Sequence, residues 1–130
     1  MPRELIASKD LTQAVPYHYA AAAVGQTVVF TAGACPLDET GCIVAEDIPG
    51  QTRQAMANLA VALRDAGCSR ADIVKTTVFV ASSSRDDLVS AWDEYTAVFG
   101  TDGPPSTLLG VAVLGWPDQL VEVEAIAVRD

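Results

Sequence analysis

The sequence predicts an α+β fold in which two helices pack on one face of a mixed β-sheet. Apolar residues alternate at strand period in several short segments and recur at helical spacing in two longer ones. In chain order the pattern gives a strand pair, a helix, a strand, a helix and two final strands. No repeat, low-complexity tract or linker divides the chain, so residues 1–130 are expected to form a single domain.

The first pair of predicted strands is a hairpin near the N-terminus. Residues 18–24 are mostly alanine, Gly25 interrupts them, and residues 27–31 have high strand propensity. We therefore expect these two segments to pair with each other. Gly33 then permits a close backbone approach, and Pro36 ends the pairing.

Capping and stop signals predict two amphipathic helices. Asp47 can cap a first helix that ends at Gly67. Ser83 or Ser84 can cap a second helix that ends at Gly100. The apolar stripe of the second helix consists of Leu88, Ala91, Trp92, Tyr95, Val98 and Phe99.

Three more strands are predicted at residues 73–81, 108–114 and 120–128. The last is apolar on both faces except at Glu122 and Glu124, which share one face with Leu120, Ile126 and Val128. A carboxylate taken from water among apolar neighbours needs a partner, so these two glutamates are candidates for chemistry. The alternative is that this face meets solvent midway along the strand.

The predicted helices cover only one face of the sheet. A small sheet whose second face is also apolar is expected to bury that face against another subunit. The sequence therefore predicts an obligate oligomer.

Composition argues against several classes of partner. The net charge is -9 with only eight Lys and Arg residues, so no basic stripe is present to bind nucleic acid or an anionic membrane. No run of about 18 apolar residues marks a membrane span, and residues 1–4 lack the apolar segment of a secretory signal. A cytoplasmic location is the expectation.

The three cysteines give no metal or disulfide pattern. Cys35, Cys42 and Cys68 are odd in number and lack C-x-x-C spacing, and His18 is the one histidine, so no metal site is predicted. A nucleophilic pair of Cys35 and His18 is a minor alternative, because nothing nearby indicates a lowered thiol pKa.

Several segments together resemble the Rid (YjgF, L-PSP) family across nearly the whole chain. The most specific are the Val-Lys-Thr-Thr-Val-Phe-Val strand and the Glu-x-Glu-Ala-Ile-Ala ending, at this separation. The segments are residues 30–33 (Phe-Thr-Ala-Gly), 51–55 (Gln-Thr-Arg-Gln-Ala), 58–59 (Asn-Leu), 72–80 and 121–128.

The resemblance implies a chorismate-mutase-like fold and a homotrimer around a central barrel of sheets, with three clefts between subunits that bind a small molecule. The best-known activity of the family is hydrolysis of reactive imines and enamines, such as 2-aminoacrylate and 2-iminobutanoate, to 2-oxo acids and ammonia. The resemblance implies that this hydrolysis needs no cofactor.

The family's site residues map onto this chain only in part. The glutamate that positions water maps onto Glu122, a cleft tyrosine maps onto Tyr17, and a backbone site lies beside Gly33. The arginine that clamps the substrate carboxylate does not map, because Pro-x-Arg-Ser/Thr is replaced here by Pro-Pro-Ser-Thr, ending in Ser106 and Thr107. Serine cannot make that bidentate charged contact. The chain resembles an arginine-less branch of the family, unless an arginine from elsewhere, such as Arg3 or Arg129 of a neighbouring subunit, approaches.

Two functions follow from these observations. The first is cofactor-independent hydrolytic deamination of an imine or enamine other than a 2-imino acid, in which Glu122 orients water and Ser106, Thr107 and backbone N–H groups bind substrate. The second is a non-catalytic trimer that binds a small metabolite. A third, endoribonuclease activity, is disfavoured by the acidic charge.

Overall fold

The computed structural model of the protein describes residues 3–130 and has the mixed sheet that the sequence predicts. The four-stranded sheet has the order β3-β6-β4-β5, with β4 and β5 parallel and the other neighbours antiparallel. Strands β1 and β2 form a separate two-stranded sheet. The elements are β1 (Arg3–Ile6), β2 (Ala20–Ala23), β3 (Thr27–Phe30), α1 (Ile48–Asp65), a 3-10 turn (Arg70–Asp72), β4 (Ile73–Val80), α2 (Arg85–Ala97), β5 (Ser106–Gly110) and β6 (Val121–Arg129).

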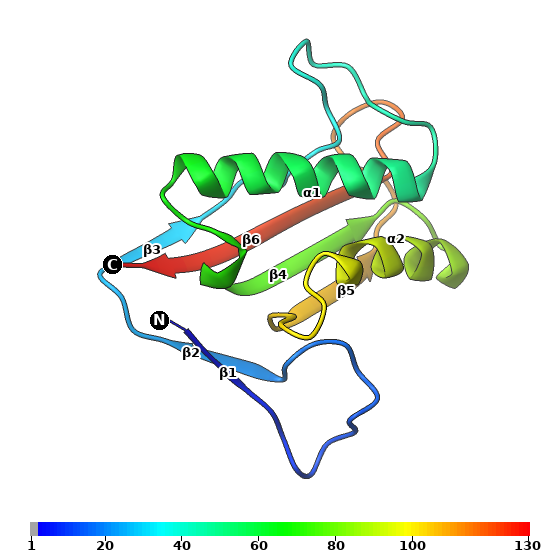
Figure 1. Ribbon diagram of the computed structural model, residues 1–130. Coiled ribbons are helices and arrows are strands. Elements are labelled where there is room, and N and C mark those ends of the chain that lie inside the picture. The colour runs from blue at the N-terminus through cyan, green and yellow to red at the C-terminus, as the bar shows by residue number, and fades with distance from the viewer. Residues whose placement is uncertain (1–2) are drawn as a thin grey trace.

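Both helices lie on the same face of the four-stranded sheet, as predicted (Figure 1). Helix α1 begins after Asp47, whose carboxylate accepts a hydrogen bond from the backbone N–H of Gly50 at 2.9 Å. This is the cap expected from the sequence. Ser84 is the N-cap residue of α2, although its side chain makes no capping bond. Within residues 3–130, no helix combines the length and apolar composition needed to cross a bilayer.

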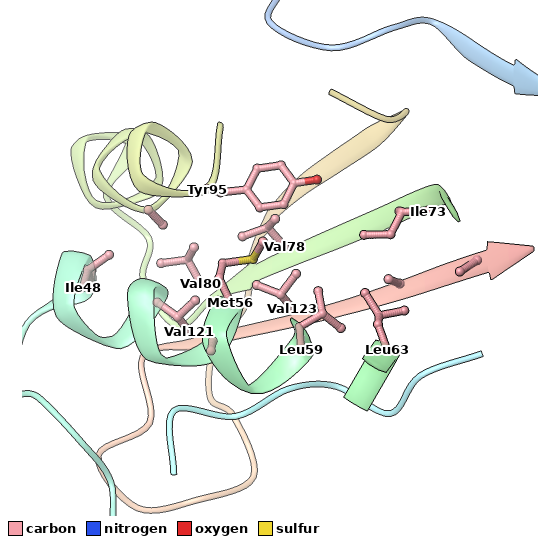
Figure 2. Packing of buried hydrophobic residues seen from close by; sticks show 14 of the residues in the cluster. Ile48, Met56, Leu59, Leu63, Ile73, Val78, Val80, Tyr95, Val121 and Val123 are labelled. Atoms are coloured by element: carbon pink, nitrogen blue, oxygen red, sulfur yellow. The ribbon is translucent and has the colours of Figure 1, made fainter. Parts of the chain in front are cut away.

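The core lies between the helices and the sheet (Figure 2). Every second residue of β6 is buried beneath α1, beginning with Val121 and Val123. Leu59 and Leu63 of α1 pack onto them, and Tyr95 of α2 lies over β4 with about 1% of its surface exposed. Period-2 alternation thus assigns the intervening residues of β6, including Glu122 and Glu124, to the opposite face.

No helix covers that opposite face within the described residues, and it carries exposed apolar side chains. Phe30 is 73% exposed, and it stands across from Ile126 in the antiparallel register. On the other edge, Leu109 is 43% exposed beside Phe79. We call this surface the open face. It is the uncovered second face that the sequence predicts.

The predicted N-terminal hairpin is wrong. Residues Ala20–Ala23 pair with Arg3–Ile6, and residues Thr27–Phe30 pair instead with the C-terminal end of β6. Alanine has low strand propensity and forms no distinctive cross-strand pairs, so an alanine segment does not specify its partner. The partner of β3 is chosen by its valines and phenylalanine, which match the apolar residues of β6.

A β-bulge follows β3 and shapes the region around Gly33. Phe30 stands opposite Ile126, whereas Ala34 bridges to Val123, so four steps along one segment match three along β6. The extra residue re-aims the side chains that follow. The segment after β3 therefore remains hydrogen-bonded to β6 while changing its register.

Candidate functional site

Glu122 lies on the open face near the start of β6, and two side chains hold its carboxylate. The amide Nε2 of Gln119 donates to Oε1 at 3.2 Å, and the thiol of Cys35 donates to the same oxygen at 3.3 Å. Glu122 is half-buried, so this carboxylate is partly withdrawn from water yet reachable. The other oxygen, Oε2, accepts no hydrogen bond from the described residues.

Gly33 is required for space rather than for backbone conformation. A Cβ on Gly33 would lie 2.7 Å from the Glu122 Cγ and would overlap the carboxylate. The close approach predicted at Gly33 is confirmed, and the group that approaches is the side chain of Glu122. We call Gly33, Cys35, Gln119 and Glu122 the carboxylate cluster.

The Cys35 thiol remains protonated beside Glu122. Burial raises its pKa, and the hydrogen bond and negative charge of Glu122 raise it further. The thiol is therefore the donor in this contact. The Nδ1 of His18 is 2.8 Å from the carbonyl of Gly103, and His18 makes no hydrogen bond to Cys35 within one copy of the described residues, so a single copy does not form a Cys35–His18 nucleophilic pair.

Ser106 belongs to a second group of polar side chains. Its hydroxyl lies 2.8 Å from both the Thr76 hydroxyl and the Tyr95 phenol, and it donates to the carbonyl of Pro104 at 2.8 Å. Thr76 and Tyr95 also contact each other through their oxygens. We call Thr76, Tyr95 and Ser106 the hydroxyl cluster.

The hydrogens of the hydroxyl cluster are all used internally. Burial raises the pKa of Tyr95, so its phenol stays protonated, although its contacts with Ser106 and Thr76 act in the other direction. Each hydroxyl has a single hydrogen. Four contacts join these hydroxyl groups to one another and to the carbonyl of Pro104, so the three hydrogens can satisfy at most three of the four contacts. No hydroxyl hydrogen of this cluster remains for a ligand.

Tyr17 connects to the hydroxyl cluster through aromatic contacts. Its ring meets Trp92 edge-on at 6.1 Å, and Trp92 stacks on Tyr95 at 5.3 Å between ring centroids. Tyr17 also meets Tyr19 edge-on at 5.8 Å. Such offset and edge-on contacts order an aromatic wall. Tyr17 and Ser106, two predicted binding residues, thus lie in one region of the chain.

Thr107 faces away from the hydroxyl cluster. Its hydroxyl accepts a hydrogen bond from Lys75 Nζ at 2.6 Å, and its register partner Thr77 stands opposite Glu124. Thr107 is exposed on the open face. Of the two residues that end the Pro-Pro-Ser-Thr segment, Ser106 is therefore half-buried on the helix side of the sheet and Thr107 is exposed on the open face.

The carboxylate cluster and Ser106 lie on opposite faces of the sheet. Ser106 pairs with Thr76, and Thr76 pairs with Ala125, which is buried beneath the helices. Glu122 is three residues from Ala125 along β6 and so has the opposite orientation. A single copy of the chain does not bring Glu122 together with Ser106 and Tyr17.

The sequence pattern does not reveal four polar side chains at these sites. It pairs Cys35 only with His18, and Gln119 carries no signal beyond its place in a turn. Tyr95 belongs to an apolar stripe, and Lys75 to a strand. Among residues 3–130, no group of three or more His, Cys, Asp or Glu side chains has the geometry to hold a metal ion.

Comparison with known proteins gives a consistent set of relatives. The model of the family described as Endoribonuclease L-PSP matches residues 8–129. A RutC family protein of Pyrococcus abyssi is 34% identical over 131 residues, covering 100% of both chains. A 2-iminobutanoate/2-iminopropanoate deaminase of Salmonella typhimurium is 38% identical over 108 residues, covering 79% of this chain and 80% of that protein. The crystal structure of YyfB, a Rid family protein of unknown function from Yersinia pestis, superimposes with a TM-score of 0.89 at 29% identity, covering 98% of this chain and 99% of that one.

Proposed function

The chain belongs to the Rid (YjgF, L-PSP) family, and from this premise we propose that it hydrolyses a reactive imine or enamine to a carbonyl compound and ammonia without a cofactor. The observation that carries the proposal is the carboxylate of Glu122, which is anchored through Oε1 and accepts no hydrogen bond at Oε2 from the described residues. A half-buried, oriented carboxylate is suited to act as a general base.

The reaction needs one proton acceptor and one water molecule. Glu122 takes a proton from water as the water oxygen bonds to the C=N carbon, and it returns this proton to the nitrogen to give a carbinolamine. Glu122 then takes the proton of the new hydroxyl group and passes it to the nitrogen, so that the C–N bond breaks with its electron pair going to the leaving ammonia and the carbonyl group forms. An enamine enters the same sequence after a proton shift to its imine tautomer.

The substrate class follows from the hydroxyl cluster. The deaminase relative from Salmonella typhimurium is named for 2-imino acids. In this chain Ser106 stands in place of a clamping arginine, and its hydroxyl hydrogen is held by Pro104. A charge-assisted bond to a carboxylate is worth roughly 1.5–3 kcal/mol, and the hydroxyl cluster offers no equivalent donor. The proposed substrate is therefore an imine or enamine without a carboxylate.

The proposed site forms between copies of the chain in a homotrimer. Glu122 on one copy and the region of Tyr17 and Ser106 on its neighbour would then line one cleft. The exposed apolar side chains of the open face, Phe30 and Leu109 among them, support an assembly that covers this face.

Non-catalytic binding of a small neutral metabolite is the second candidate. It is favoured by the enclosed hydrogens of the hydroxyl cluster, since a site without a carboxylate clamp holds a charged substrate weakly. A ligand that binds equally to wild type and to Glu122→Gln, with turnover by neither, would support binding over hydrolysis.

The test of the proposed function introduces at position 106 the arginine that this chain lacks. Wild type should hydrolyse 2-iminopropanoate or 2-iminobutanoate, generated in situ from an amino acid, at or near the uncatalysed rate, whereas Ser106→Arg should accelerate it. The gain requires Glu122, so Ser106→Arg combined with Glu122→Gln should lose most of it.

Two results would contradict this interpretation. Enzyme-like turnover of these imino acids by wild type would mean that another residue holds the carboxylate. A folded but inert Ser106→Arg variant would mean that the cleft differs at further positions. Unfolding must be measured in parallel, because the new guanidinium enters a region where Tyr95 and Thr76 are buried.

A further inference from the structure

We propose that Gln119 and Cys35 are positioning residues that fix the orientation of the Glu122 carboxylate through Oε1 and leave Oε2 to receive the proton of water. The inference rests on the proposed function, because it gives these two residues a purpose only if Glu122 is a base. Their donor atoms lie 3.2 Å (Gln119 Nε2) and 3.3 Å (Cys35 Sγ) from Oε1.

The orientation of the Gln119 amide is determined by its partners. Gln119 is 4% exposed, and its Oε1 accepts from the backbone N–H of Trp116 at 3.1 Å. A backbone N–H only donates, so the amide oxygen must face Trp116. The Nε2 group then donates to the carbonyl of Val121 at 3.1 Å and to Glu122. An amide turned the other way would place an oxygen against the carboxylate.

The position of Cys35 is fixed from the opposite side. Asn58 on α1 donates through Nδ2 to the carbonyls of Cys35 and Leu37, each at 2.8 Å. This ties the segment that follows the bulge to the first helix. On its other side, the backbone of Ala34 exchanges two hydrogen bonds with the backbone of Val123, with nitrogen–oxygen distances of 2.7 and 3.1 Å. The thiol therefore approaches Glu122 from backbone that is held on both sides.

The two donors define the plane of the carboxylate. They approach Oε1 from different segments of the chain, Gln119 from the turn before β6 and Cys35 from the segment after β3. Gly33 lies against Oε2 and presents no side chain there. The carboxylate thus keeps one oxygen for the protein and one for a ligand, which is the arrangement that a positioned base requires.

The first experiment needs no turnover. Alkylation of Cys35 is followed against pH by peptide mass spectrometry in a Cys42→Ala background, which removes the exposed thiol. Because Glu122 raises the pKa of the Cys35 thiol, Glu122→Gln should move its reactivity to lower pH. An identical profile in Glu122→Gln would overturn the inference, since the thiol would not face the carboxylate in solution.

The second experiment measures kcat and KM with any imine that the wild type hydrolyses. Gln119→Met and Cys35→Ala should each lower kcat by about tenfold or more with little change in KM. Each change removes a donor that orients the Glu122 carboxylate and leaves the proposed substrate-binding residues intact. Cys35→Ser retains a donor and should recover part of the loss. Cys42→Ala is the control and should match wild type. Equal kcat values for Gln119→Met and wild type would overturn a positioning role.

The two experiments separate two kinds of failure. A shifted Cys35 profile with no turnover of any imine or enamine would reject the proposed function while leaving the contact with Glu122 established. Turnover that depends on Glu122 but is indifferent to Gln119 and Cys35 would keep the function and reject the inference.

Discussion

The carboxylate cluster and the hydroxyl cluster are both made of hydrogen-bonded polar side chains, and they differ in what they leave available. Both side chains that donate to the Glu122 carboxylate bind Oε1, so Oε2 has no hydrogen-bond donor among residues 3–130. In the hydroxyl cluster the hydrogens of Thr76, Tyr95 and Ser106 are all used. The carboxylate cluster leaves an oxygen that can accept a proton, whereas the hydroxyl cluster leaves no hydrogen to donate.

The carboxylate cluster and the hydroxyl cluster also differ in how deeply they are buried. Thr76 and Tyr95 are each about 1% exposed, between β4 and α2, whereas Glu122 is half-buried on the open face. A buried polar group must be satisfied internally, because water is absent. A half-buried carboxylate can have one oxygen satisfied by the protein and the other by water or substrate. Polarity alone therefore does not distinguish the two clusters; the oxygen left without a protein donor does.

A substitution that separates the copies of the chain should have the largest effect, because the carboxylate cluster and the hydroxyl cluster are proposed to meet between copies. Phe30→Lys places a charge on the open face, where the phenylalanine side chain is 73% exposed in a single copy. If that face is buried between copies, the charge should convert the proposed trimer to smaller species and abolish the proposed turnover, because Glu122 would then lose the neighbouring Ser106 region. Sedimentation velocity at fixed protein concentration measures the change.

The control for this variant is Val113→Lys. Val113 is 79% exposed but lies in the loop between β5 and β6, outside the open face. It should leave the assembly unchanged. A Phe30→Lys protein that sediments like wild type would show that the open face is not the interface, and the two clusters would then have to act separately.

Adding one methyl group to Gly33 should disrupt the carboxylate cluster alone. The new Cβ would overlap the carboxylate of Glu122, so the side chain or the bulge must move. Gly33→Ala should displace the Glu122 carboxylate from its observed position and remove Glu122-dependent turnover, with a smaller effect on the unfolding free energy because the displaced atoms are those of a flexible side chain. Gly115→Ala is the matched control, because no atom lies within 4 Å of the position that its Cβ would take. Full activity in Gly33→Ala would mean that Glu122 does not need its observed orientation.

The fold was largely predictable because local signals and the hydrophobic period agree. Asp47 and Gly67 define the ends of α1, and the alternation of β6 assigns Glu122 to the uncovered face. The N-terminal pairing was not predictable, because the alanines of β2 carry no information about their partner. Arg3 links this strand pair to the main sheet, because its guanidinium donates to the carbonyl of Ile73 at the start of β4 at 2.6 Å.

The candidate site was predictable only where a single residue carries the chemistry. The family resemblance selected Glu122 and Gly33, and the structure places them in contact. The contact of Cys35 with Glu122 depends on a bulge that shifts the register by one residue, which no periodicity reveals. The hydroxyl cluster depends on the parallel register of β4 and β5, which sets Ser106 beside Thr76.

Removing one phenol oxygen should have the smallest effect and should measure how closed the hydroxyl cluster is. Tyr95→Phe deletes the oxygen that contacts Thr76 and Ser106 but keeps the ring that stacks on Trp92. The loss of buried hydrogen bonds should lower the unfolding free energy by about 1–2 kcal/mol, measured by urea denaturation at one protein concentration. Tyr19→Phe is the matched control, because its phenol makes an exposed bond to the carbonyl of Thr12 at 2.7 Å, and its effect should be under about 0.5 kcal/mol. If both variants are equally stable, water or a ligand already shares the hydrogens of the hydroxyl cluster, and Ser106 would have a donor available for substrate after all.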